Sequence, residues 1–361
     1  MVRGFAAATV LVIAGLFQSV AVAADIRLGT WNLMRLGQGE TSYEAIAAIA
    51  ATVDLLAIQE VMNQTGIERV ETAVEARTGE AWSVIVSSPV GSTRYRETYA
   101  FLTRDSAVTY DEGAVLYLDR KNVFIREPFS AKFRTAAGAT FAIANVHILY
   151  GKRESDRIPE IAELAAYWAW LKEVYPGEEL LLAGDFNMPP SHAGFAPLRR
   201  YARPLVTSGA STLSHTSGKF ANLFDNIFVA QDSKLTITAA GVVNYPSMLG
   251  LSHSQARAYV SDHAPIFVQL GRGRLPPGVQ LIPQQKVVRV GAPIERTQPA
   301  NDSRSGASRS PAPVHANRSS GIYHLPQGCP SYGRVSARNL EVFASEEEAV
   351  AARYRRAGNC R

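Results

Sequence analysis

The stretch Leu180-Leu-Leu-Ala-Gly-Asp-Phe-Asn187 decides the fold that we expect for this chain. Its apolar half is typical of a buried strand, and it ends at Gly184, where the backbone can turn sharply. Beyond the glycine, an acid and an amide stand two residues apart, and side chains at that spacing share one face of a strand. Asp185 and Asn187 can therefore point together from the end of a sheet. The alternative is a strand that simply ends in a turn.

The pattern of an apolar segment with a reactive residue at its edge recurs along the chain. Strands are expected over 26–31, 54–58, 82–86, 100–103, 140–146, 180–184, 223–229 and 260–268, and helices over 44–53, 64–78 and 155–174. The polar residues at the strand edges are Asn32, Glu60, Glu97, His147, Asp225, Asp262 and His263. Charges at a sheet rim cost free energy unless they are paired or bind a metal. The recurrence therefore favours one functional site over a series of turn residues.

The remaining histidines do not follow this pattern. His192, His215, His253 and His315 fall in segments that contain Ser, Pro or Gly, and we expect them to be solvated.

A series of short motifs resembles the endonuclease/exonuclease/phosphatase superfamily and, within it, the deoxyribonuclease I-like branch. In chain order they are Thr30-Trp-Asn32, Gln59-Glu-Val61, Tyr95-Arg-Glu-Thr-Tyr-Ala-Phe-Leu102, Arg126-Glu-Pro128, Asn145-Val-His147, Gly184-Asp-Phe-Asn187, Asp225-Asn-Ile227 and Ser261-Asp-His263. The resemblance covers about residues 25–270. It implies an α/β (α+β) fold, a four-layered sandwich of two packed β-sheets flanked by helices. The alternation of apolar segments agrees with that architecture.

The resemblance also implies a role for each of these residues. Glu60 matches the principal divalent-metal ligand, and Asn32 and Asp262 match groups that help to hold the metal or its waters. His263 with Asp225, and His147 with Glu97, match two histidine–carboxylate pairs, while Asp185 and Asn187 match residues that orient water and phosphate. Tyr95 and Arg126 match positions near the bound strand. The implied cofactor is Mg²⁺ or Mn²⁺, and the implied substrate is DNA, with RNA as an alternative.

The physical chemistry of the reaction suits this set of residues. A phosphodiester is an anion that repels hydroxide, so its hydrolysis requires neutralised charge and a deprotonated water in line with the leaving oxygen. Mg²⁺ prefers carboxylate and water oxygens. A histidine that a carboxylate holds in one tautomer is a suitable acid or base near neutral pH. The sequence does not assign which histidine is the acid and which is the base.

The sequence departs from the deoxyribonuclease I pattern at the expected DNA contacts. Met34 and Met62 stand where that branch has arginines that enter the minor groove, and Arg35, one place displaced, is expected to compensate. Apart from Glu127, the calcium-site residues of the branch are not recognisable, which leaves a structural Ca²⁺ as an open alternative.

The N-terminal residues suggest export. Residues 1–24 have the features of a secretory signal: Arg3, an apolar run over 5–20, and small residues before an expected cleavage near Ala23/Ala24. We therefore expect a mature protein that is secreted or periplasmic, has no membrane segment and is a monomer without a stable protein partner. An N-terminal membrane anchor is the alternative.

The C-terminal part differs from the body in charge and composition. Residues 25–271 carry 22 Lys and Arg against 26 Asp and Glu, whereas residues 272–361 carry 14 against 6. The basic tail is expected to add non-specific attraction to polyanions. The expected organisation is a signal peptide over 1–24, a catalytic domain over 25–271, a disordered linker over 272–318 and a small disulfide-linked α/β module over 319–361.

Both cysteines of the chain, Cys329 and Cys360, lie in that last module. The module resembles one found behind some secreted nucleases and, more distantly, the four-cysteine zinc module of a DNA alkylation-repair methyltransferase. A zinc site made of His324 and two cysteines would be one ligand short. We therefore favour a Cys329–Cys360 disulfide, as is usual for a cysteine pair in an exported protein.

The sequence allows three functions. The first is a divalent-metal-dependent endonuclease, and the second is a phosphodiesterase or phosphatase of the same superfamily that acts on sphingomyelin or another phosphorylated small molecule. A sphingomyelinase would need exposed apolar membrane-binding loops, and the sequence shows no convincing one. The third, a non-enzymatic binding protein, predicts the loss of a central residue, and none is lost.

Overall fold

The computed structural model describes residues 25–92, 95–216, 218–282, 313–318, 321–327, 329, 332, 335, 339–357 and 360. The backbone divides into two compact units, Met1–Val288 and Arg289–Arg361. The expected signal segment, 1–24, and most of the expected linker, 272–318, lie outside the described residues. Within the described part of the chain, no helix is both long and apolar enough to cross a bilayer.

The first sheet of the larger unit has the strand order β12-β13-β1-β2-β5-β3, with β4 also paired to β5. Its strands are β1 (Arg27–Leu36), β2 (Leu55–Val61), β3 (Trp82–Val86), β4 (Val90–Ser92), β5 (Tyr95–Arg104), β12 (Ile237–Val242) and β13 (Ile266–Leu270). Strands β1 and β2 run parallel, and their register pairs Asn32 with Gln59. Because parallel strands end at the same edge of a sheet, Asn32 and Glu60 emerge close together.

The second sheet has the order β10-β11-β9-β8-β7-β6. Its strands are β6 (Val108–Leu116), β7 (Phe129–Thr135), β8 (Thr140–His147), β9 (Glu179–Asp185), β10 (Ala202–Pro204) and β11 (Asp225–Ala230). The register aligns His147 with Asp185 across the parallel pair β8 and β9, and Asp185 with Asp225 across the antiparallel pair β9 and β11. Three residues expected at the site thus form one row at the sheet edge.

The core follows the two-residue period of the strands. On β9, Leu181 and Ala183 pack between the two sheets, whereas Leu180 and Leu182 pack on the opposite face. That face is covered by α3 (Ile158–Val174). Each fully buried Leu or Phe of such a core stabilises the fold by roughly 1.5–3 kcal/mol.

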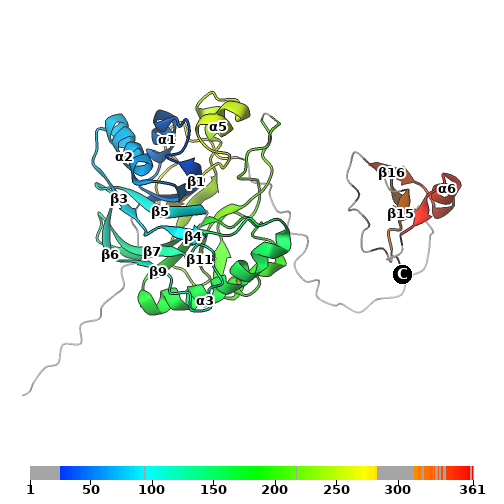
Figure 1. The fold of residues 1–361 in the computed structure, drawn as a ribbon, viewed down its shortest axis with the longest axis horizontal. Helices are drawn as coiled ribbons and strands as arrows, with labels where there is room; N and C mark the ends of the chain where they lie inside the picture. Colours follow the sequence, from blue (N-terminus) through cyan, green and yellow to red (C-terminus); the bar gives the residue numbers. More distant parts are fainter. Residues whose placement is uncertain are drawn as a thin grey trace, which may run out of the picture. The chain divides into compact units, whose positions relative to one another are not determined.

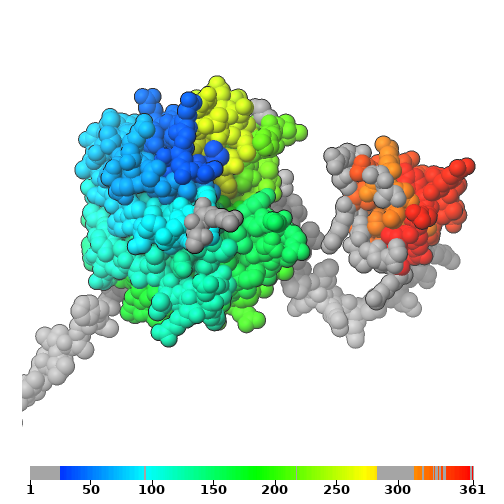
Figure 2. All heavy atoms as spheres, viewed as in Figure 1, coloured from blue at the N-terminus to red at the C-terminus, as the bar shows by residue number. Residues whose placement is uncertain are grey.

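Helices cover both outer faces. Those over the first sheet are α1 (Tyr43–Ala50), α2 (Gln64–Thr78) and α5 (His253–Tyr259), and α3 lies on the far side of the second sheet (Figure 1). The other short elements are η1 (Glu154–Arg157), η2 (Ala193–Phe195), η3 (Leu198–Arg200) and α4 (Tyr245–Met248). Figure 2 shows the blue segment around α1 beside the yellow segment around α5, where Ser42 N donates to Tyr259 O. The order helix, sheet, sheet, helix confirms the expected four-layered α/β fold.

Expectations about local structure are wrong in three places. The strand expected over 260–268 begins only at Ile266, because Pro265 has no amide hydrogen for a ladder. The histidine expected to be solvated at 253 is only 4% exposed, since it opens α5 and packs against Phe220 at 5.0 Å between ring centroids. His315 also belongs to a strand, and its ring stacks on Tyr332 at 4.3 Å.

The smaller unit contains a four-stranded sheet in the order β16-β14-β15-β17. Its elements are β14 (Val314–Asn317), β15 (Ile322–His324), β16 (Leu340–Phe343), α6 (Glu346–Ala351) and β17 (Arg355–Arg356). Strand β14 lies inside the range expected to be linker. Among the described residues of this unit, one hydrophobic cluster contains the buried residues Val314, Ala316, Tyr323 and Ala349. A core of this size usually needs a further constraint, and here Cys329 is bonded to Cys360. The expected disulfide is therefore present.

Candidate active site

Two histidine–carboxylate pairs lie at the edge where the two sheets meet. His147 Nδ1 lies 2.7 Å from Glu97 Oε1, and His263 Nδ1 lies 2.8 Å from Asp225 Oδ2. Both carboxylates are almost completely buried. Because each carboxylate accepts a hydrogen bond from the Nδ1 atom of its histidine, the Nε2 atom of each ring is directed to other partners. The structure thus brings together both pairs that the sequence predicted.

The two Nε2 atoms converge on one buried carboxylate. His147 Nε2 and His263 Nε2 each lie 3.7 Å from Asp185 Oδ2. Asp185 is 1% exposed, and its other oxygen accepts a hydrogen bond of 2.8 Å from Asn187 N. Both rings can therefore act on one small group placed beside Asp185.

Glu60 lies next to this centre and faces outward more than Glu97, Asp185 and Asp225. Its Oε1 is 3.9 Å from His147 Nε2 and accepts a hydrogen bond of 3.0 Å from Asn32 Nδ2. Its Oε2 accepts hydrogen bonds of 3.0 Å from Arg35 N and from the Tyr95 hydroxyl. Side-chain exposure of 17% leaves the Glu60 carboxylate reachable from solvent.

The backbone around the site is strained. Met34, Arg35, Glu60 and Asn187 have φ angles of 41°, 60°, 59° and 49°, a left-handed conformation that costs a non-glycine residue roughly 1–3 kcal/mol. Gly184, with φ 145°, is required for a different reason, because a Cβ there would lie 2.0 Å from Val146 O. Strain that gathers in one place indicates a site shaped for function rather than for stability.

Opposing electrostatic effects set the protonation of the rings. Burial and the nearby Arg126 disfavour a charged His147, but the carboxylates of Glu97 and Asp185 outweigh them and hold its pKa above the ordinary value. Burial also opposes protonation of His263, yet Asp225 and Asp185 raise its pKa to about 10. Burial raises the pKa of Asp185, but the two imidazoles outweigh this effect and the pKa lies below its usual value. In the metal-free chain, His263 is therefore cationic near neutral pH, and the carboxylates make His147 easier to protonate than an ordinary imidazole.

The residues expected near the substrate take different positions. Tyr95 is half-buried and bonded to Glu60, whereas the Arg35 side chain is exposed and donates from Nε to Gln38 at 3.2 Å. Arg126 is only 8% exposed, and its guanidinium donates to the carbonyls of His147 and Ile148. These bonds make Arg126 a support for the loop after β8.

Two of the expected metal ligands are engaged by protein groups. Asn32 directs its amide nitrogen to Glu60 and Asp185, while its oxygen accepts a hydrogen bond of 2.9 Å from Met34 N. Asp262 lies 3.5 Å from Arg257, with side-chain exposure of 31%. The amide of Asn32 thus lies between two carboxylates that would otherwise repel each other.

Several supporting residues had no role in the sequence prediction. Ser211 donates from its hydroxyl to Asp225 Oδ2 at 2.6 Å, and Ser261 donates to Asn32 O at 2.6 Å while accepting from His263 N. Arg157, 8% exposed, donates from Nη1 to Asn187 O at 2.6 Å. Only Ser261 falls in a motif quoted from the sequence. The contacts of Ser211 and Arg157 are formed by tertiary packing, which leaves no local signal.

A buried polar link fixes the two sheets to each other beneath the site. Gln59 Nε2 donates to Asn145 Oδ1 at 2.6 Å, and Asn145 Nδ2 donates to Ile58 O at 2.9 Å. Both side chains are fully buried, so each lost bond would cost roughly 1–3 kcal/mol. The link holds the edge of β2 against β8 and so fixes the distance between Glu60 and His147.

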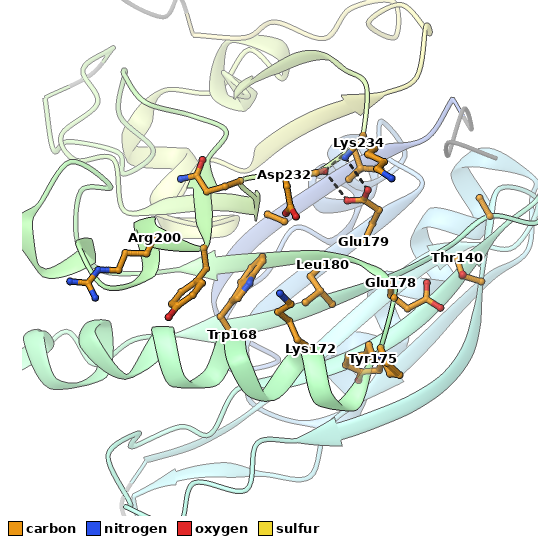
Figure 3. Close-up of a pocket in the computed structure, with 18 of the residues that line it drawn as sticks. Thr140, Trp168, Lys172, Tyr175, Glu178, Glu179, Leu180, Arg200, Asp232 and Lys234 are labelled. Carbon is orange, nitrogen blue, oxygen red and sulfur yellow. Dashed lines mark hydrogen bonds between the residues drawn. The ribbon is translucent and has the colours of Figure 1, made fainter. Parts of the chain in front are cut away.

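A cavity of about 1110 Å³ lies at the end of the second sheet opposite to the histidine–carboxylate pairs (Figure 3). Its lining includes Glu179 and Ala230, the first residue of β9 and the last residue of β11, whereas Asp185 and Asp225 occupy the other ends of these strands. The Glu179 carboxylate accepts hydrogen bonds from the Ser233 hydroxyl and from the backbone amide of Lys234. The cavity is therefore separate from the histidine–carboxylate site.

Comparison with known proteins agrees with this geometry. The chain is 47% identical over 258 residues to a protein named Deoxyribonuclease from Thioalkalivibrio sp. (strain K90mix), covering 69% of this chain and 72% of the relative. It is 27% identical over 286 residues to Deoxyribonuclease-1 from Canis lupus familiaris, covering 73% of this chain and 96% of the relative. A solved endonuclease/exonuclease/phosphatase family protein from Bacteroides thetaiotaomicron shares the fold, with a TM-score of 0.50, 15% identity and coverage of 68% of this chain and 98% of that one. Residues 29–263 match the family model described as Endonuclease/Exonuclease/phosphatase family, and the chain belongs to that family.

Proposed function

We propose that this protein is a secreted, divalent-metal-dependent endonuclease that hydrolyses phosphodiester bonds of DNA. The observation that carries the proposal is the convergence of His147 and His263, each bonded to a buried carboxylate, on one oxygen of Asp185. The likeness to deoxyribonucleases, 47% identical in one case, supports DNA as the substrate. RNA is an alternative substrate.

In this proposal, the chain's own groups hold the phosphate and move the protons. With one phosphorus beside Asp185, both Nε2 atoms reach its oxygens, so one ring can take a proton from water and the other can give one to the leaving oxygen. Glu97 and Asp225 hold the rings in the required tautomer and offset their positive charge. Asn187 orients the phosphate. Such general acid–base catalysis contributes about 10²–10⁴-fold for each group.

The donor set fits a hard divalent cation. Glu60, Glu97, Asp185 and Asp225 place four carboxylates around two imidazoles and Arg126, and Glu60 is the member nearest to solvent. Glu60 would hold the ion, together with Asn32 once its amide oxygen is turned inward, and Asp262 would hold it through water. The bound ion would neutralise charge on the phosphate. We propose Mg²⁺, with Mn²⁺ as the alternative and a further Ca²⁺ site left open.

Export rests on residues 1–24, whose charge and apolar run fit a secretory signal. Intact-mass measurement of protein from the medium and from the periplasm tests this part. A mature N-terminus near Ala23/Ala24 supports export, and an uncleaved chain retained in the cytoplasm contradicts it.

Plasmid nicking by the purified chain tests the catalytic proposal. Nicking with Mg²⁺ that stops in EDTA and falls by at least about 10²-fold in His147→Ala and in His263→Ala is the expected result. His192→Ala is the matched control, because His192 caps η2 and lies outside the convergent pairs. Intact plasmid with every divalent ion tried would refute the proposal, and cleavage of RNA alone would move it to the alternative substrate.

A further inference from the structure

An exposed aromatic ring stands beside the catalytic loop after β8. Tyr150 follows His147 by three positions and is 59% exposed, whereas Ile148 between them is buried. The loop is held from several sides, because Arg126 and Asn187 donate to Ile148 O and Leu149 N donates to Glu160. Tyr150 therefore sits on a fixed segment rather than on a free loop.

One face of the Tyr150 ring is supported by a buried guanidinium. Arg157 Cζ lies 4.4 Å from the Tyr150 ring centroid, and the Phe224 ring lies 5.5 Å from the same Cζ atom. Arg157 also donates to Tyr150 O at 2.8 Å and to Asn187 O at 2.6 Å. The guanidinium thus fixes the ring relative to Asn187, whose backbone amide donates a hydrogen bond to Asp185. Since its exposed fraction is large, the other face of the ring is free to bind.

The same turn carries two exposed cations, Lys152 and Arg153, which are followed by the exposed acid Glu154. Gly151, with φ 63°, turns the chain tightly over Asp156, whose carboxylate accepts from the amides of Lys152 and Arg153. The Arg153 side chain is 81% exposed and pairs with Asp156 only loosely, at 3.6 Å. A fixed aromatic face next to cations is the combination by which proteins hold single-stranded nucleic acid, through base stacking and phosphate attraction.

We propose that Tyr150 is a stacking platform for one unpaired base of the DNA strand being cut, next to the scissile phosphate. This inference rests on the proposed nuclease function and specifies its substrate as single-stranded or locally unpaired DNA. In an intact duplex each base is already stacked between its neighbours, so its face is closed to a protein ring. Binding at Tyr150 therefore favours a strand whose base is free.

The test measures binding and cleavage by the full chain. Two probes of equal length are used, a fluorescent single strand and its blunt duplex, with binding followed in EDTA and cleavage followed with Mg²⁺. Tyr150→Ala should weaken binding of the single strand roughly tenfold and change binding of the duplex much less, whereas Tyr150→Phe, which keeps the ring, should bind as the unchanged protein does. Tyr201→Ala is the control, because Tyr201 is comparably exposed at 48% but lines the remote cavity.

A fluorescent base analogue in the strand gives a signal that loss of folding would not imitate. Its emission should be quenched when the base stacks on the unchanged protein or on Tyr150→Phe. Tyr150→Ala should cause no quenching, although its melting temperature should equal that of Tyr201→Ala. Equal single-strand binding by Tyr150→Ala and Tyr201→Ala, or an equal loss on both probes, overturns the inference. If the unchanged protein cleaves plasmid while Tyr150→Ala behaves as the control, only the inference fails; if it cleaves no DNA, the proposed function fails as well.

Discussion

Asn32 donates a hydrogen bond of 3.1 Å from its side-chain amide to Asp185 Oδ2, which joins β1 of the first sheet to β9 of the second. The same nitrogen lies 3.0 Å from Glu60 Oε1. The two sheets therefore meet inside the candidate active site, and their packing decides whether the acids and the histidines can act together.

Asn32→Asp should destabilise the metal-free protein. The variant replaces a shared donor by a third carboxylate beside Glu60 and Asp185, and like charges at this distance repel. We expect a lower melting temperature than that of the unchanged protein in EDTA, with a difference that shrinks when Mg²⁺ is added. The exposed Asn122→Asp is the control. An equal difference with and without Mg²⁺ would argue against a cation site at this position.

Glu97→Gln should lower the pKa of His147. The Glu97 carboxylate raises this pKa against the opposing effects of burial and Arg126, so an uncharged amide leaves the ring neutral at a lower pH. NMR titration of the His147 ring protons measures the change, and nicking activity should fall about tenfold or more. Glu112→Gln, a change at a side chain that is 70% exposed, should alter neither quantity. An unchanged His147 pKa would mean that Glu97 does not control the ring.

His263 should stabilise the metal-free fold in a particular range of pH. Its folded-state pKa of about 10 lies above the unfolded value of about 6.5, so its contribution is complete below pH 6.5 and is lost as the pH rises toward 10. Melting temperatures of the unchanged protein and of His263→Gln, measured in EDTA across this range, should therefore converge at alkaline pH. A constant difference between the two proteins would contradict the raised pKa.

Arg157→Met should reduce turnover as well as single-strand binding at Tyr150. Arg157 holds Asn187 O at 2.6 Å, and Asn187 needs this support because its φ is 49°. Loss of a buried charged donor costs roughly 1.5–3 kcal/mol, which we expect to appear in kcat and in the melting temperature. Arg200→Met is the control, because Arg200 is exposed and lines the remote cavity. Unchanged kcat in a folded Arg157→Met would show that the loops hold their positions without it.

Reduction of the Cys329–Cys360 bond should affect only the smaller unit. The disulfide closes a sequence separation of 31 residues, for which the chain-entropy model gives roughly 3–4 kcal/mol. We expect the mass of the intact chain to rise by about 2 Da on reduction. Proteolysis should then remove the C-terminal part while nicking by the catalytic domain continues. Zinc bound at stoichiometric level without a change in mass would instead favour a thiolate site that includes His324.

Much of the fold could be predicted because a long segment with a clear hydrophobic period indicates its own secondary structure. Helix α2 has the bounds expected from the sequence, and β9 was recognised from Leu180 to Gly184 because strands buried on both faces read as continuous apolar runs. Strand β6 was missed, since five of its nine residues are exposed and no apolar alternation survives. Helix α5 was missed because its residues carry no extended apolar stripe.

The family, the layered fold and the list of reactive side chains could be read from residue type, order and spacing. Which of these side chains meet depends on how the strands pair, because the register of β8, β9 and β11 aligns His147, Asp185 and Asp225. The tertiary structure also turns Asn32 toward two carboxylates, buries Arg126 under the loop after β8 and places Arg157 behind Tyr150. Such contacts join segments far apart in the chain, and their geometry is set by the packing of two sheets, which no local pattern records.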